Sequence, residues 1–316
     1  MRNLTLLSLC LALFLLRASY GHQRLVVFGD SLSDNGNTFA VSGFPGIPYF
    51  DGRYSNGPNW VDYFHGIAEH FNVDISLPTP WLQDPTNIDD NATDFAVGGS
   101  TSGDLNVLNE TFPALPTFPK FPDQIMAYET LLRLKNENAA DDLCVIWIGA
   151  NDFAAGIKPP ETIANIKGAI EKLSTFGVKD FVVVTIPDLA LTPQVQAPPG
   201  ATVLAATQFV VTTNVLLAVE LPRFAFAHQI SIDLVDSNAF FIPLVFSPGA
   251  FGFTNSSGEA YNPTLQLSSF NPVPDPNDYV FWDGFHPTTN VYKLAATFIF
   301  KNIFLSRQIR PFLSLR

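Results

Sequence analysis

The chain is poor in cysteine and in positive charge. Its 316 residues include two cysteines, and 17 Lys and Arg stand against 29 Asp and Glu, so the formal charge is −12. So few thiols exclude a fold held together by several disulfides, and the stability has to come from a buried core. The negative charge argues against nucleic acid and anionic membrane surfaces as partners. The composition therefore favours a ligand that is neutral or only weakly charged.

Several sequence signals of common cofactor sites are also missing. No Gly-x-Gly-x-x-Gly follows the first apolar run and no phosphate-binding P-loop appears, which argues against a dinucleotide or ATP role. His65 and His70 are five residues apart, whereas two zinc ligands on one helical face are four apart. The acidic run Asp89 to Asp94 lacks the spacing of a calcium loop. We therefore expect no metal and no cofactor.

Nothing in the sequence divides the chain into parts. Only 15% of the residues are charged and 47% are hydrophobic, which is the opposite of a disordered composition. There is no linker rich in Gly or Ser, no internal repeat and no block of like charge. We predict a single domain over residues 22–316.

The first 21 residues have the pattern of a secretory signal peptide. Arg2 precedes an apolar stretch, Leu4 to Leu16, that is too short to span a bilayer, and small residues before position 22 fit a cleavage site. Removing 21 of 316 residues, including two arginines, leaves 295 residues with a charge of −14. Cys10 is removed as well. Cys144 is then the remaining thiol, and its place in an expected strand predicts that it is buried and inert.

Other features agree with export. Three N-glycosylation sequons begin at Asn91, Asn109 and Asn255, each in a polar, turn-rich stretch. No further apolar run is expected to span a membrane, and the segment Phe304 to Arg316 carries arginines rather than the uncharged tail of a lipid-anchor signal. The sequence predicts a secreted, extracellular, soluble glycoprotein with no integral membrane segment.

Short apolar runs alternate with longer amphipathic segments along the rest of the chain. The short runs have the form of strands buried on both faces of a parallel sheet, so the alternation predicts an α/β fold with right-handed crossovers. We expect strands at Arg24–Phe28, Leu143–Ile148, Phe181–Ile186 and Ile230–Val235, and helices at Trp60–Phe71, Asp123–Asn136, Glu161–Phe176, Ala201–Phe226 and Pro287–Phe304. Pro222 is expected to kink or end the fourth helix.

Prolines cluster in three segments, Leu77–Pro122, Pro187–Pro199 and Pro243–Pro276. Long irregular segments in a compact domain are usually functional loops, so we expect these segments to wall a binding site. The alternative is variable surface decoration.

The first expected strand runs into Gly29-Asp30-Ser31. A serine at the carboxyl end of a parallel strand, after a glycine that permits a tight turn, lies where open α/β sheets bind their ligands. Ser31 is therefore a candidate nucleophile. Alternatively, Ser31, Ser33 or Asp34 caps a helix that begins here.

Asp283 and His286 form a second candidate pair near the other end of the chain. Three residues apart in a compact turn, the carboxylate can accept a hydrogen bond from one imidazole nitrogen while the other nitrogen faces a serine. None of the other four histidines has an acidic residue at a comparable spacing in a turn. Pro287, which follows, is suited to open a helix.

Two further segments offer hydrogen-bond donors for a developing oxyanion. Gly98 and Gly99 end an apolar stretch, and the backbone N–H groups of glycines can approach a ligand closely. Asn151 follows the expected strand Leu143–Ile148, so its side-chain amide can donate into the same crevice. A simple turn and an Asx-turn are the alternatives.

These blocks, in this order, resemble the GDSL esterase and lipase family, also called SGNH hydrolases. Gly29-Asp30-Ser31-Leu32 matches the motif that gives the name, and the segment Gly52 to Trp60 resembles one shared by plant and fungal members. Gly98-Gly99, Gly149-Ala150-Asn151-Asp152 and Asp283-Gly284-Phe285-His286 match the remaining blocks. The Gly-x-Ser-x-Gly elbow of ordinary α/β-hydrolases is absent, which separates the chain from that fold.

The resemblance implies a three-layer α/β/α sandwich with a flavodoxin-like parallel sheet. It implies that Ser31 attacks an ester carbonyl, that His286 takes the proton and that Asp283 orients the imidazole. The implied oxyanion hole consists of Ser31, Gly99 and Asn151, with Gly98 as the alternative glycine.

The chain also resembles secreted fungal members of this family, which include acetyl esterases. That likeness implies removal of acetyl or other short acyl groups from plant cell-wall carbohydrates, with a small-molecule or oligosaccharide ester as substrate. Trp60, Trp81 and Trp282 are expected either to stack on sugars or to pack in the core. The alternatives are a lipase or phospholipase of the same family and a carbohydrate-binding glycoprotein without turnover.

Overall fold

The computed structural model describes residues 24–71, 73–75, 77–83, 93–197, 202–263 and 272–313, with side chains as far as residue 304. The expected signal peptide, with Cys10, and the sequon at Asn91 lie outside the described residues. The predictions of a signal peptide and of one domain over 22–316 therefore stay predictions.

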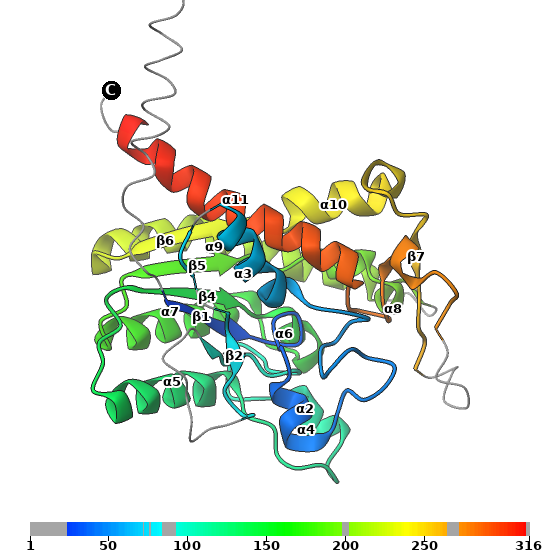
Figure 1. Cartoon of the computed structure of the whole chain (residues 1–316), viewed down its shortest axis with the longest axis horizontal. Helices are drawn as coiled ribbons and strands as arrows, with labels where there is room; N and C mark the ends of the chain where they lie inside the picture. Colours follow the sequence, from blue (N-terminus) through cyan, green and yellow to red (C-terminus); the bar gives the residue numbers. More distant parts are fainter. Residues whose placement is uncertain are drawn as a thin grey trace, which may run out of the picture.

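A parallel six-stranded sheet forms the centre of the fold (Figure 1). Its order is β2-β3-β1-β4-β5-β6, with every pairing parallel. The strands are β1 (Arg24–Gly29), β2 (Thr79–Pro80), β3 (Thr93–Asp94), β4 (Asp142–Trp147), β5 (Asp180–Val184) and β6 (Ser231–Val235). The four long strands match the four predicted ones. β2 and β3 were not predicted, because two residues are too few to show any period.

Helices cover both faces of the sheet, which confirms the predicted three-layer α/β/α sandwich (Figure 1). One face carries α3 (Trp60–His70) and α11 (Thr289–Leu313), and the other carries α5 (Phe121–Lys135), α7 (Pro159–Thr175) and α9 (Val203–His228). Asn59 caps α3 in a capping box with Asp62, which explains why this helix begins at Trp60.

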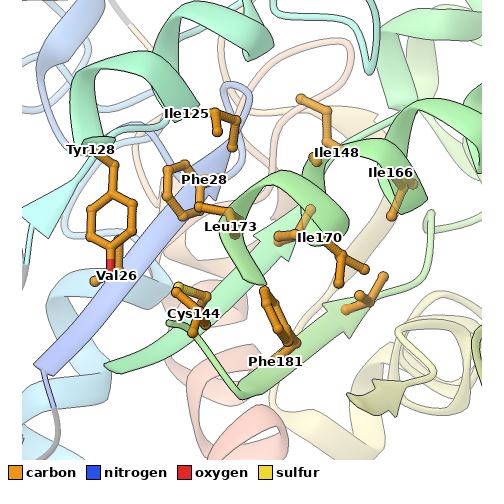
Figure 2. Packing of buried hydrophobic residues seen from close by; sticks show 14 of the residues in the cluster. Val26, Phe28, Ile125, Tyr128, Cys144, Ile148, Ile166, Ile170, Leu173 and Phe181 are labelled. Carbon is orange, nitrogen blue, oxygen red and sulfur yellow. The ribbon is translucent and has the colours of Figure 1, made fainter. Parts of the chain in front are cut away.

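The side chains of β1 divide between the two layers of core. Leu25 and Val27 face α3 and α11, whereas Val26 and Phe28 face α5 and α7, as the period of two along a strand requires. Figure 2 shows the second layer, where Phe28 lies near Tyr128 of α5. Both faces are apolar, so the strand reads in the sequence as an unbroken apolar run.

The remaining elements lie in the connections between the predicted strands and helices. They are helices α2 (Asn37–Ser42), α4 (Val107–Thr111), α6 (Ala150–Ala155), α8 (Pro193–Gln196) and α10 (Asn238–Phe246), the 3₁₀ turns η1 (Leu189–Leu191), η2 (Pro248–Phe251) and η3 (Pro276–Asp278), and a second, two-stranded sheet of β7 (Asn255–Glu259) and β8 (Tyr279–Phe281). They are short, so helical spacing has little length over which to appear.

Three expectations about helices need correction. α9 continues past Pro222 to His228, so this proline does not end it, and the alternative of a kink stays a prediction. α11 begins at Thr289, so Pro287 precedes the helix rather than opening it. α9 is also long enough, and its mean hydropathy is high enough, to cross a membrane. The sequence was expected to hold no further apolar run of this kind. The buried residues of α9, among them Phe209 and Leu217, nevertheless pack against the rest of the sandwich.

The thiol and two of the sequons can be placed in this fold. Cys144 is free and fully buried in β4, and its burial raises the pKa of the thiol well above the ordinary value (Figure 2). Asn109 lies within the short helix α4 and exchanges hydrogen bonds with the backbone of Phe118. Asn255 begins β7. Glycosylation of either asparagine stays a prediction.

The strand order determines where a ligand is expected. Without the short edge strand β2, the order β3-β1-β4-β5-β6 is that of flavodoxin-like sheets. The chain winds in opposite directions from β1, and in such sheets ligands bind outside the carboxyl ends of the strands at this switch point. The crevice beyond the ends of β1 and β4 is therefore the predicted binding region.

Candidate active site

Ser31 lies directly beyond β1, at this crevice. The backbone oxygen of Asp30 accepts hydrogen bonds from the N–H groups of Ser33 and Asp34, both at 3.0 Å, which closes a tight turn around Ser31. Gly29 has to be a glycine, because a Cβ there would lie 2.4 Å from the backbone oxygen of Trp147 on β4. The turn presents the Ser31 side chain to a cavity.

The structure brings Ser31, His286 and Asp283 together. His286 Nε2 lies 2.8 Å from Ser31 Oγ, and His286 Nδ1 lies 2.8 Å from Asp283 Oδ2. Asp283 Oδ1 also accepts the backbone N–H groups of Phe285 at 2.9 Å and of His286 at 2.8 Å. The Asp283 side chain is 7% exposed and that of His286 15% exposed. The turn therefore fixes the carboxylate and the imidazole against each other.

Two buried carboxyl groups at the site have opposite pKa shifts. Burial alone would raise the pKa of Asp283, but the charge and hydrogen bond of His286 and the backbone donors hold it below its ordinary value. Burial raises the pKa of Asp30 to about 7. Asp30 Oδ1 accepts only the N–H of Leu32, and no described residue donates to Oδ2. Both carboxyl groups are buried, so their different hydrogen-bond and charge partners explain why their pKa values shift in opposite directions.

The two glycines of the second block have different surroundings. The Gly98 N–H donates to Asp34 Oδ2 and Thr38 Oγ1, both at 2.8 Å, so the fold already uses it. Gly99 lines the cavity with a φ of 77°, and its N–H has no partner among the described residues. A Cβ on Gly98 would lie 2.2 Å from the Tyr54 hydroxyl. The geometry favours Gly99 over Gly98 as a donor to the cavity.

Asn151 lines the same cavity from the start of α6. Its Nδ2 donates one hydrogen bond to the backbone oxygen of Ser100 at 2.9 Å. Because a primary amide carries two N–H groups, the second remains for a ligand. The neighbouring Asp152 accepts hydrogen bonds from Ser102 and Thr162. The segment that holds Asn151 is therefore bonded to the segment that follows Gly98-Gly99.

The segment Gly52 to Trp60 connects the two ends of the site, a role that the sequence did not indicate. Asn59 Nδ2 donates to the backbone oxygens of Ser33 at 3.1 Å and Asp34 at 3.0 Å. Ser55 Oγ donates to the backbone oxygen of Pro287 at 2.9 Å. The segment thus holds the serine turn and the histidine turn, 255 residues apart, in one arrangement.

A cavity of about 290 Å³ opens beside Ser31. Its apolar wall comes from several elements: Leu32, Val107, Leu108, Trp147, Ala150, Phe153, Ala154, Pro187, Leu189, Val195, Phe240, Phe241, Phe285, Pro287, Val291 and Ala295. None of the described residues that line it is a lysine or an arginine. Of the three proline-rich segments, the first two contribute to the wall. The third, Pro243–Pro276, contributes none of its described residues, and its residues 264–271 lie outside the described part of the chain.

The tryptophans singled out in the sequence do not face the cavity. Trp60 is fully buried and Trp282 is 1% exposed, while Trp81 is half-buried against Phe95. Stacking of Trp60 or Trp282 on a sugar is therefore wrong, and core packing, the alternative reading, holds for both.

A hydrogen-bonded serine, histidine and aspartate at the switch point of a doubly wound sheet is the arrangement that serine hydrolases use. Residues 25–299 match the family described as GDSL-like Lipase/Acylhydrolase, and the chain belongs to this family. The predicted family is therefore confirmed. At the level of the family, so is the prediction of an enzyme that acts on ester bonds.

The chain is similar to several curated proteins. It is 28% identical over 291 residues to a thermolabile hemolysin of Vibrio parahaemolyticus, an alignment that covers 87% of this chain and 62% of the hemolysin. It is 26% identical over 333 residues to a phosphatidylcholine-sterol acyltransferase of Aeromonas hydrophila, covering 88% of this chain and 90% of that protein. Among solved structures, an acetylxylan esterase of Geobacillus stearothermophilus aligns with a TM-score of 0.46 at 15% identity, covering 89% of this chain and 94% of the esterase.

Proposed function

We propose that this protein is a serine carboxylic ester hydrolase in which Ser31 is the nucleophile. The observation that carries the proposal is the pair of 2.8 Å distances that link Ser31 Oγ to His286 Nε2 and His286 Nδ1 to Asp283 Oδ2. A binding protein without turnover has no need for a serine held on a base that is itself oriented by a carboxylate.

The reaction follows from these atoms. As Ser31 Oγ bonds to the ester carbonyl carbon, His286 Nε2 takes the serine proton and Asp283 stabilises the imidazolium. The carbonyl electron pair moves onto oxygen, where the N–H groups of Gly99 and Ser31 and the free Asn151 N–H stabilise it. His286 then gives its proton to the leaving alcohol as the C–O bond breaks. Water, deprotonated by His286, releases the acid from Ser31 in the second half.

The cavity beside Ser31 supports an uncharged, extended acyl group. Its wall is mostly aliphatic and aromatic, and no cation among its described residues could pair with a phosphate or carboxylate. An acetyl group would leave most of this apolar wall without contact. The cavity thus favours the lipase or phospholipase alternative over short acyl groups on cell-wall carbohydrate. The relative whose name specifies phosphatidylcholine points in the same direction.

The acyl chain has a defined direction in this proposal. From Ser31 the cavity continues towards α10 and α11, where Phe240, Phe241, Val291 and Ala295 line it. A closely packed region beyond shares Trp147, Ser237, Phe240 and Ala295 with the cavity and extends to Phe298 of α11. We place the methyl end of the acyl chain against Phe240, which lines both.

Export is part of the same proposal. The apolar segment Leu4 to Leu16 and the sequons support secretion, and a fully buried thiol at Cys144 is compatible with an oxidising compartment. A soluble, extracellular enzyme that acts on neutral esters would also suit a formal charge of −12.

The test is hydrolysis of p-nitrophenyl esters from acetyl to palmitoyl by wild type and by Ser31→Ala. We expect wild-type kcat/KM to rise with acyl length before it falls, and the variant to lose at least about 10⁴-fold, because the nucleophile is absent. If wild type prefers the acetyl ester, the predicted removal of short acyl groups holds instead. Hydrolysis that survives in Ser31→Ala would contradict the proposed function.

A further inference from the structure

We propose that Tyr49 is a positioning residue that holds the Asp283 carboxylate through Oδ2, the oxygen that also faces His286 Nδ1, and thereby tunes the catalytic base. The inference rests on the proposed function, because it assigns Asp283 and His286 their roles in ester hydrolysis. Tyr49 lies outside every motif block, and nothing in its sequence context marks it.

The hydrogen bonds of Asp283 define what Tyr49 contributes. Asp283 Oδ1 is held by two backbone N–H groups of its own turn, those of Phe285 and His286, and lies 2.9 Å from His286 Nδ1. Asp283 Oδ2 accepts from His286 Nδ1 and from the Tyr49 hydroxyl, each at 2.8 Å. Among the described residues, Tyr49 is the one donor to Asp283 that comes from outside the Asp283 to His286 turn.

The Tyr49 ring is fixed by its aromatic neighbours. It meets Tyr54, Tyr261 and Trp282 edge to face, with ring centroids 6.4, 5.7 and 5.9 Å away. Tyr54 in turn packs beside the His286 ring, with centroids 5.0 Å apart. A ring held on three sides costs little further entropy to place its hydroxyl on Asp283.

The hydroxyl remains a donor at every pH at which the protein is folded. Burial raises the pKa of Tyr49, and the negative charge of Asp283 raises it further. Its proton therefore stays on the phenol and is donated to Asp283 Oδ2, the acceptor that the described residues provide.

Donation to a carboxylate draws negative charge away from the imidazole. Without the Tyr49 hydroxyl, Asp283 would be held by its own turn alone, and its charge would stabilise the protonated imidazole more strongly. The base must be unprotonated to accept the serine proton, so the acid limb of kcat/KM should move to higher pH. The substitution leaves in the chain the other titratable groups that interact with the pair: Asp30, Tyr54, Glu259, Tyr261 and Tyr292.

The experiment is Tyr49→Phe, which removes the hydroxyl and keeps the ring. We expect kcat to fall about 3- to 10-fold with KM nearly unchanged, and the acid limb of kcat/KM to rise by about half a pH unit. Tyr279→Phe is the matched control. Its ring packs in the same cluster as Tyr49, and among the described residues no hydrogen bond joins its hydroxyl to Asp283. We expect it to leave the pH profile where it is.

A double-mutant cycle separates positioning from a general effect on folding. In an Asp283→Asn background the carboxylate is absent, so adding Tyr49→Phe should change kcat by less than about twofold. An equal loss in both backgrounds, or an unmoved acid limb, would overturn the proposal. These outcomes differ from failure of the proposed function, in which wild type would show no hydrolysis that depends on Ser31.

Discussion

The two sides of Ser31 are built in different ways. On one side, Ser31 of the first block meets His286 and Asp283 of the last block at hydrogen-bond distances, and Gly99 and Asn151 of the two blocks between them line the same cavity. On the other side, apolar residues from α6, η1, α8, α10 and α11 form a smooth wall. The polar side has a marked sequence pattern, whereas the apolar wall has none.

The difference reflects what each side has to do. Proton transfer and oxyanion stabilisation require particular atoms within about 3 Å of the reacting centre, so few residue types are suitable. An acyl cavity requires shape and apolar surface, which many combinations of Leu, Val, Ala and Phe supply equally well. We therefore expect changes on the polar side to affect rate, and changes on the apolar side to affect which ester is hydrolysed.

The largest of these effects is expected for Asn151→Ala. Removing one oxyanion donor typically costs about 10²- to 10³-fold in kcat, with little change in KM, because the contact forms in the transition state. The control is Asn290→Ala, at an exposed position on α11, which should leave kcat unchanged. If Asn151→Ala lowers kcat for the preferred ester by less than tenfold, this residue is not part of the oxyanion hole.

The apolar side predicts a change in selectivity instead. Phe240→Ala should open the cavity towards Phe298 and shift the preferred acyl group to longer chains. Each additional buried CH₂ contributes about 0.8 kcal/mol, or roughly fourfold in kcat/KM. The matched control is Phe246→Ala on the same helix, where the ring is 71% exposed and outside the cavity. An unchanged acyl-length profile in Phe240→Ala would mean that the chain runs elsewhere.

The sequence predicted more of the polar side than of the apolar side. Ser31, Asn151, Asp283 and His286 lie in blocks whose order is specific, and the strands that carry the first two are long enough to recognise. The resemblance implied Gly99 with Gly98 as the alternative, and the physical reason for the preference lies in the hydrogen bonds that Gly98 makes to Asp34 and Thr38. Which of two adjacent N–H groups is free depends on tertiary contacts that no local pattern records.

Other features could not be read from the sequence for similar reasons. Tyr49 meets Asp283 across 234 residues, and a single tyrosine in a loop has no periodicity to mark it. Phe240 and Phe241 belong to α10, a nine-residue helix whose sequence is apolar on all sides and therefore shows no preferred face. Trp60 and Trp282 lie beside motif blocks and still face the core, because proximity in sequence does not determine where a ring points.

The smallest effect concerns Asp30, at the boundary between the two sides. Its pKa is raised to about 7 in the folded protein, so the protonated form stabilises the fold fully below about pH 4, and that contribution is lost as the pH rises through about 7. Asp30→Asn removes the titration. Urea unfolding should therefore show the variant gaining on wild type by on the order of 1–3 kcal/mol between pH 5 and pH 8. If the free energy of unfolding differs between variant and wild type by the same amount at pH 5 and pH 8, Asp30 is paired with another group.

The most direct test of the central claim is to identify the residue that becomes covalently modified. A fluorophosphonate that mimics the tetrahedral intermediate should label wild type once per chain as hydrolysis is lost, and mass spectrometry of the digested protein should place the label on Ser31. His286→Ala should label far more slowly, because the serine proton then has no acceptor. A label on any other residue, or full inhibition of wild type with Ser31 unmodified, would contradict the account.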